Sequence, residues 1–215
     1  MENLIIKREN VIAAYQDASN EQKKLLRALF PEADFEAGAQ PEGYVRQRDS
    51  SIPIEERIYT FEDACAWHGL DAQALESLWR EQHMMTDEVA YQKLRLIVSA
   101  LNEGWEPEFT QEEIRWYPWH YLWTAEELVG KDEDWKKRKA LISVEAYKQE
   151  GWAGFACAYS DDAPSAAGAN VGSRLCLKSE ALSDLAATRF IALWADFKLI
   201  RRVEPAYPEK PEDEK

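Results

Sequence analysis

The stretch from Trp105 to Trp123 constrains the fold of this chain more than any other. It reads WEPEFTQEEIRWYPWHYLW and holds four of the nine tryptophans. In its second half the aromatic side chains alternate, and alternation with a period of two is typical of a β-strand. Because Pro118 has no backbone N–H, the strand is predicted to lie at a sheet edge or to be bulged. One side of this strand carries Trp116, His120 and Leu122. The other side carries Tyr117, Trp119, Tyr121 and Trp123.

Most of the remaining sequence has helical periodicity with start and stop signals. Capping residues such as Thr60 with Asp63, or Asp71, precede apolar stripes, and Gly69 and Gly104 follow them. A Glu-Gly-Trp triplet at 103–105 and again at 150–152 predicts a tryptophan folded back on the last turn of a helix. The predicted helices are 9–17, 21–30, 61–68, 71–83, 87–103, one ending at Gly151, and one C-terminal helix beginning at Ser179 or Ser183 and running to about residue 200.

The predicted fold class is α+β, mostly helical, with a small antiparallel sheet of about three strands. The strands are expected at 114–123, 154–159 and 173–178, and the C-terminal helix is expected to pack across them. We predict an N-terminal helical hairpin at 1–31, a linker at 32–51, an α+β core domain at 52–203 and a disordered acidic tail at 204–215.

The charge balance limits the partners. The net charge is −14 and the sequence pI about 4.8, which disfavours broad contact with nucleic acid and with anionic membranes. A basic protein partner, or imitation of nucleic-acid charge, is compatible with it. The chain has no run of 18 apolar residues, so we expect no membrane association. It has only three cysteines, so we expect a cytoplasmic location, with the virion as an alternative.

Chemical motifs are weak. Cys65 and His68 have the spacing of metal ligands on a helix, but no second pair accompanies them. The glycine-containing segment 168–174 lacks the lysine of a phosphate-binding P-loop and leads into a predicted strand. We therefore predict no metal, no cofactor and no enzymatic activity.

The aromatic segment is the main candidate for function, with core packing as the alternative interpretation. Tryptophan and tyrosine dominate binding hot spots, so a protein partner is the leading hypothesis. A single-strand binder stacking bases on Trp116, Tyr117 and Trp119, or an acidic decoy of a DNA-binding protein, is the second. The third is a ligand binder or enzyme with a pocket by the 160–173 loop. The candidate site residues are Arg115, Trp116, Tyr117, Trp119, Tyr121, Trp123, Tyr159 and Arg174.

Several long motifs resemble a family of uncharacterised proteins from phages and mobile elements of gut Bacteroidota. They are VIAAYQDASNEQKKLLRALFP, RIYTFEDACAWHG, KLRLIVSALNEGWEPEF, RWYPWHYL and VGSRLCLKSEALSDLAATRFIALWADF, and the likeness spans residues 9–200. The resemblance implies a phage-type interaction or structural protein, and it supplies no catalytic residue.

Overall fold

The computed structural model describes residues 22, 25–26, 44–166, 173–202 and 206. The hairpin predicted at 1–31 and the acidic tail predicted at 204–215 lie almost wholly outside these residues. So do most of the linker at 32–51 and positions 167–172 of the glycine-containing loop. Those expectations stay predictions.

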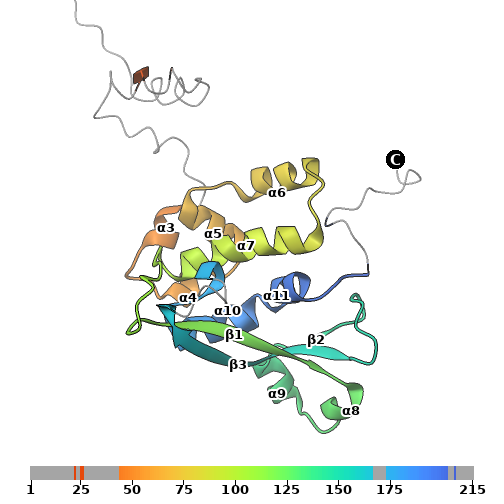
Figure 1. The fold of residues 1–215 in the computed structure, drawn as a ribbon. Helices are drawn as coiled ribbons and strands as arrows, with labels where there is room; N and C mark the ends of the chain where they lie inside the picture. Colours follow the sequence, from red (N-terminus) through yellow and green to blue (C-terminus); the bar gives the residue numbers. More distant parts are fainter. Residues whose placement is uncertain (1–21, 23–24, 27–43, 167–172, 203–205, 207–215) are drawn as a thin grey trace, which may run out of the picture.

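The fold is α+β, as predicted, with helices predominating over a small antiparallel sheet (Figure 1). None of the described helices is long and apolar enough to cross a membrane. The helices are α3 (Tyr44–Arg48), α4 (Ile54–Arg57), α5 (Phe61–His68), α6 (Ala72–Glu81), α7 (Thr86–Leu101), α8 (Ala125–Leu128), α9 (Glu133–Arg138), α10 (Glu180–Arg189) and α11 (Ile191–Lys198), with a 3-10 helix η3 (Ser173–Leu175). The strands are β1 (Ile114–Trp123), β2 (Ile142–Ser143) and β3 (Gly154–Pro164).

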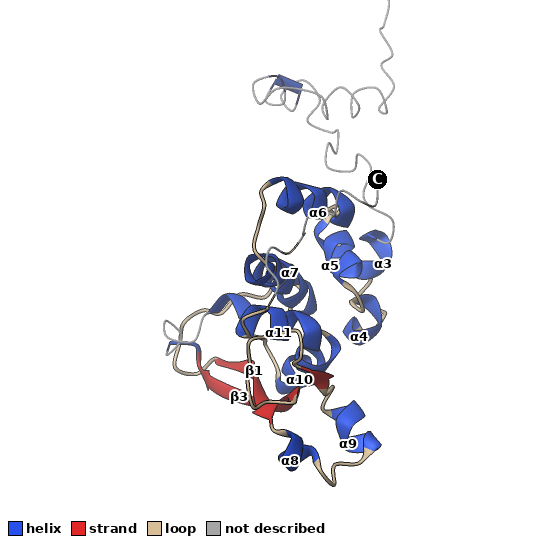
Figure 2. Cartoon of the chain, turned by 90° about the vertical axis from the view of Figure 1, so that its right-hand side faces the viewer, coloured by secondary structure: helices blue, strands red, loops and turns tan. Residues whose placement is uncertain are grey.

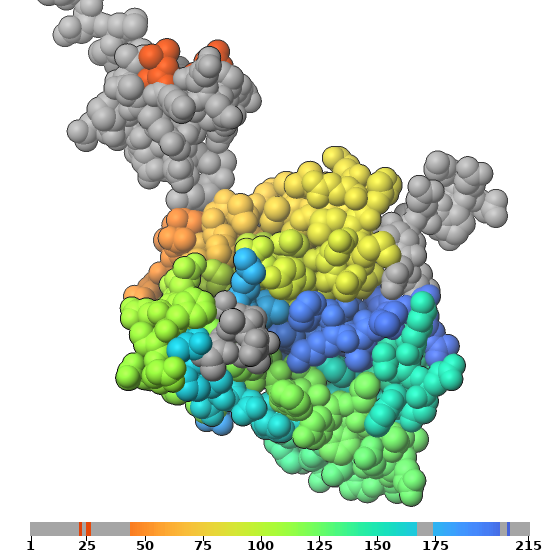
Figure 3. Space-filling view, in the orientation of Figure 1, coloured from red at the N-terminus to blue at the C-terminus, as the bar shows by residue number. Residues whose placement is uncertain are grey.

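The elements form layers. Helices α5, α6 and α7 make one layer, α10 and α11 lie beneath it, and the sheet follows, with α8 and α9 at one end (Figures 1 and 2). Helix α11 packs on α7, whereas α10 packs on β1 and β3. In the space-filling view α11 forms a band between the helical layer and the sheet region (Figure 3). The main core therefore lies around α7, α10 and α11.

Local capping signals set several helix starts, as predicted. The Thr60 hydroxyl accepts a hydrogen bond from the Asp63 N–H while the Asp63 carboxylate accepts one from the Thr60 N–H. Asp71 caps α6 and Thr124 caps α8. Gly69 ends α5 with φ of 73°, a left-handed conformation that favours glycine. Such signals involve neighbours in the sequence only, which is why the sequence reveals them.

The sheet has the order β1-β3-β2, and β1 is an edge strand with a register shift between Trp119 and His120. From Pro118 we predicted an edge position or a bulge, and the strand has both. The third strand differs from the prediction, because it is β2 and not 173–178. That segment begins with η3 and makes one bridge, from Leu177 to Trp116. The Asn102 side chain binds the carbonyl before Leu177 and the N–H after it, so these groups are unavailable for a longer ladder.

The prediction of a helix that ends at Gly151 is wrong. After β2 the chain turns, and Tyr147 is buried with its hydroxyl donating to Asp196 of α11 at 2.7 Å. This long-range contact and a bridge from Tyr147 to Arg201 hold the segment in turns. Trp152 is consequently not packed on a helix and is 43% exposed. At the other triplet Gly104 adopts the left-handed conformation with φ of 78°, as Gly151 does with φ of 83°, and Glu103 before it is also left-handed with φ of 55°.

The predicted single C-terminal helix is two helices. Ser179 caps α10, as predicted, but the chain breaks at Phe190, where φ is −109°. The break lets the Trp194 indole fold back, and its Nε1–H donates to the Ala186 carbonyl of α10 at 3.1 Å. Burial of Phe190 and Trp194 against the rest of the core favours this bend over a straight helix.

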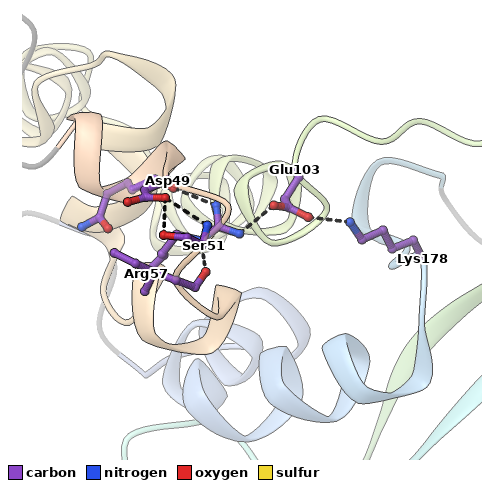
Figure 4. Close-up of polar contacts among 7 residues, drawn as sticks. Asp49, Ser51, Arg57, Glu103 and Lys178 are labelled. Carbon is purple, nitrogen blue, oxygen red and sulfur yellow. Dashed lines mark hydrogen bonds and ion pairs between the residues drawn. The ribbon is translucent and has the colours of Figure 1, made fainter.

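Part of the predicted linker is helical. It contains α3, which packs against α5. The segment after it carries Arg57, which is only 3% exposed and is held by three acceptors. These are the Ile52 carbonyl (2.8 Å), the Gln47 carbonyl (3.0 Å) and Glu103 Oε1 (2.6 Å). Figure 4 shows Glu103 between Arg57 and Lys178, with Asp49 accepting bonds from Ser51 nearby. The network joins α4 to the end of α7. The hydrogen bond from Arg57, and to a smaller extent the one from Lys178, lowers the pKa of the Glu103 carboxyl group.

Candidate functional site

One side of β1 belongs to the core. His120 stacks on Phe155 of β3, with ring centroids 4.9 Å apart, and lies 5.7 Å from the Trp194 ring of α11. Leu122 packs against the core, and Trp116 is half-buried and paired with Leu177. The alternation read from the sequence therefore corresponds to an inner and an outer side, with His120 and Leu122 inward.

The outer side carries an exposed aromatic cluster, defined here as Trp119, Tyr121 and Tyr159. Their exposed fractions are 46%, 45% and 44%. Trp119 and Tyr159, which pair across the strands, stack with centroids 6.1 Å apart and an interplanar angle of 12°. Tyr121 meets Tyr159 edge-on at 6.2 Å. Three large rings held together at this exposure form a preorganised apolar surface rather than part of the core.

Trp123 continues this side but is partly covered. The Trp135 ring of α9 meets it edge-on at 5.2 Å, and Lys131 Nζ lies 5.4 Å from its centroid. The short helices α8 and α9 thus cover the end of the sheet next to Trp123, and the exposed cluster begins at Tyr121. Of the outer aromatic residues predicted, Trp123 is the one that helps to bury this end.

The other end of the outer side is buried. Arg115 is 0% exposed, and its guanidinium carbon lies 5.7 Å from both the Phe109 and the Tyr117 ring centroids. Among the described residues its three guanidinium nitrogens have no oxygen or nitrogen acceptor and the Tyr117 hydroxyl has no partner, while the Cys176 thiol is the one hydrogen-bonding neighbour of Arg115. Burial raises the pKa of Tyr117 to about 12, with Arg115 opposing the rise. The prediction grouped these residues with the exposed aromatics, but the structure separates them.

Arg174 and Tyr159, predicted to line one pocket, lie in different cavities. Arg174 lines a cavity of about 350 Å³ with Arg95, Trp105, Phe109 and neighbouring residues. Tyr159 lines another of about 480 Å³ between β3, α10 and the end of α9. Trp119 stacks with Tyr159, so the three residues do not share a single pocket.

His120 is held as a neutral imidazole. Its Nε2 lies 3.3 Å from the Ala187 carbonyl, which can only accept, and its Nδ1 lies 2.9 Å from Lys198 Nζ. Lys198 also donates to the Pro118 carbonyl at 3.1 Å. Burial, with Lys198 adding to it, lowers the pKa of His120 to about 3. A proton on this ring would lie in the core, facing an ammonium group.

A pH dependence follows from His120. Its folded pKa of about 3 is below the unfolded value near 6.5, so between these values the unfolded state binds more protons and stability falls as the pH is lowered. From pH 7 to pH 5 we expect the free energy of unfolding to lose about 1–2 kcal/mol through this group. Urea unfolding of the wild type and of His120→Phe at both pH values measures this loss. The variant should lose less, whereas His83→Asn, at an exposed position, should behave like the wild type.

The three cysteines are buried and His68 is half-buried. Burial raises the pKa of the Cys65 thiol to about 12, and it also raises the pKa values of Cys157 and Cys176. His68 Nε2 lies 3.0 Å from the Leu96 carbonyl, and burial lowers its pKa. The described residues contain no group of three or more His, Cys, Asp or Glu side chains arranged to hold a metal ion.

The cavity that contains Arg174 was not predicted. Its other residues are Cys176 and residues of the C-terminal half of α7 and of the segment after Gly104, where Pro107 predicts extended backbone and no binding site. The one hint was Arg115 inside an aromatic strand, since a charged residue between apolar neighbours suggests either an exposed site or an unusual burial.

No family model, no curated protein and no solved structure matches this chain.

Proposed function

We propose that this protein is a non-enzymatic interaction protein that binds a basic protein partner through the aromatic cluster. The observation that carries the proposal is the exposure of three mutually packed rings, Trp119, Tyr121 and Tyr159, on the outer side of the sheet. Such rings lose little side-chain entropy on binding and present a large area, so they are typical hot-spot residues.

Charge specifies the chemistry of the partner. Asp161 and Asp162 follow the cluster along β3 and are exposed. The pKa of Tyr159 is raised by partial desolvation and also by the neighbouring Tyr121 and Asp161. With a net charge of −14, long-range attraction favours a positively charged surface. Arginine and lysine side chains of that surface can also lie over the exposed rings as cation–π partners.

The same acidic residues oppose the single-strand binding hypothesis, because nucleic-acid phosphates would meet Asp161 and Asp162 beside the rings. The resemblance to proteins of phages and mobile elements favours a phage-type setting for the interaction, in the host cytoplasm or in the virion.

Truncation of the cluster is expected to abolish partner capture. In pull-downs from infected or prophage-bearing cells, with the tagged chain as bait, Trp119→Ala and Tyr159→Ala should each weaken the affinity for a basic partner by about tenfold or more. The melting temperature should change little, because these rings are not in the core. Binding should weaken at raised salt, since rim charges contribute by long-range attraction.

Trp152→Ala is the matched control, because Trp152 is equally exposed at 43% but lies outside the cluster. It should retain the partner. Retention of the same partner by both cluster variants would refute the proposal. So would salt-sensitive quenching of tryptophan fluorescence by a single-stranded oligonucleotide that disappears in Trp119→Ala, since this would assign the cluster to nucleic acid.

A further inference from the structure

The buried pair Arg115 and Tyr117 is chemically incomplete. An arginine guanidinium has five N–H donors and a tyrosine hydroxyl one. Among the described residues none of these groups finds an oxygen or nitrogen acceptor, and Arg115 hydrogen-bonds only the Cys176 thiol, whose sulfur is a weak acceptor. Leaving an unpaired charge in the interior is strongly unfavourable, and a fold normally supplies a counter-charge or acceptors. The arrangement therefore points to an acceptor that is not part of the described chain.

The cavity beside this pair offers a place for it. Phe109 and Cys176 line the cavity of about 350 Å³, and both are also close to Arg115. The Phe109 ring centroid lies 5.7 Å from its guanidinium carbon. For the Cys176 thiol, burial raises the pKa, and the charge of Arg115 together with its hydrogen bond to the sulfur partly opposes the rise. Arg115 thus lies directly behind two residues of the cavity wall.

The cavity itself has the composition of an anion site with an apolar wall. Arg95 and Arg174 line it and are exposed, and Trp105, Pro107 and Phe109 supply apolar surface. One carboxylate, Glu106, also lines it. The nearby carboxylate of Glu113 accepts from the Glu108 N–H, and no ion pair joins it to Arg115 among the described residues. Positive charge therefore predominates.

We propose that this cavity binds a small molecule that carries a phosphate group next to a planar apolar ring. Arg95 and Arg174 hold the phosphate at the mouth, and Arg115 with Tyr117 completes its coordination when the exposed Phe109 side chain swings aside. Guanidinium groups bind phosphate through paired N–H donors, and the volume suits a small ligand. The site lies apart from the aromatic cluster, so it is independent of the protein-partner proposal.

The test measures the binding of inorganic phosphate, phenyl phosphate and benzoate by calorimetry. Their effect on the melting temperature is measured by thermal unfolding, with sodium chloride at the same ionic strength as the reference. Phenyl phosphate should raise the melting temperature saturably and bind more tightly than inorganic phosphate, because its ring contacts Trp105 and Phe109. Benzoate, with one negative charge, should bind more weakly than phenyl phosphate. Stronger binding of benzoate would assign the site to carboxylates and overturn the phosphate assignment.

Variants separate the site from general ion effects. Arg174→Ala should weaken phenyl phosphate binding by about tenfold with no change in unliganded stability, and Arg138→Ala, an exposed arginine of α9, should leave binding unchanged. Arg115→Met should abolish the phosphate-dependent shift, while its unliganded melting temperature equals or exceeds that of the wild type, because an uncompensated buried charge has been removed. An equal shift in wild type and Arg115→Met, or no shift beyond that of sodium chloride, would refute the proposal.

Discussion

Replacement of Arg57 by methionine is expected to lower the free energy of unfolding by about 2–4 kcal/mol, mainly because buried backbone carbonyls lose their donors. Arg57 is buried, and its guanidinium binds two backbone carbonyls and Glu103 Oε1. Methionine has a similar length but no donors, so the two carbonyls lose their bonds and Glu103 loses its close counter-charge. Because Glu103 has φ of 55°, the network also holds a backbone conformation that is unfavourable for a residue other than glycine.

Urea unfolding monitored by circular dichroism measures this loss. Lys178→Met is the control, since Lys178 binds the other carboxylate oxygen of Glu103 at 3.0 Å but is partly exposed. An exposed pair contributes about 0–1 kcal/mol, so the control should remain close to the wild type. A loss of less than 1 kcal/mol in Arg57→Met would show that the network does not hold α4 to α7 as described. The contrast with Arg115→Met is informative, because that buried arginine binds no carbonyl or carboxylate among the described residues.

Truncation of Trp194 to alanine is expected to cost about 3–5 kcal/mol. Trp194 is 2% exposed and contacts His120 of β1 and Phe197 of α11. Its Nε1–H bonds the last turn of α10, so the side chain joins the sheet to both C-terminal helices. Its removal leaves a cavity at the centre of the layers and frees the bend at Phe190.

The same unfolding measurement tests this expectation, and Trp194→Phe separates packing from hydrogen bonding. The phenylalanine variant keeps most of the apolar volume and loses the Nε1–H bond, so it should lose clearly less stability than the alanine variant. If Trp194→Ala remained within 1 kcal/mol of the wild type, Trp194 would not be the contact that joins these layers.

The helix caps and the aromatic strand were predictable because their causes are local. Thr60, Asp71, Thr124 and Ser179 bond backbone groups three residues away, and the alternation in β1 follows from the geometry of one strand. Pro118 indicates an edge or bulged strand for the same reason. The exposure of Trp119 and Tyr121 was a hypothesis from their number and type, with core packing as the alternative.

The third strand, the turns at 144–150 and the bend at Phe190 could not be read in this way. Each depends on a group distant in sequence: Asn102 for Cys176 and Lys178, Asp196 for Tyr147, and the surrounding core for Trp194. The helical pattern at 143–150 was real as a local preference, but burial of Tyr147 outweighed it.

The sequence by itself determined where most helices begin and that a two-sided aromatic strand exists. Only the tertiary structure decided what each aromatic residue does. Packing of α10 and α11 made one side of β1 core, α9 covered Trp123, and Phe109 with Tyr117 enclosed Arg115. Local periodicity fixes which residues share a side, but burial is set by long-range neighbours, and burial distinguishes the exposed cluster from the enclosed Arg115.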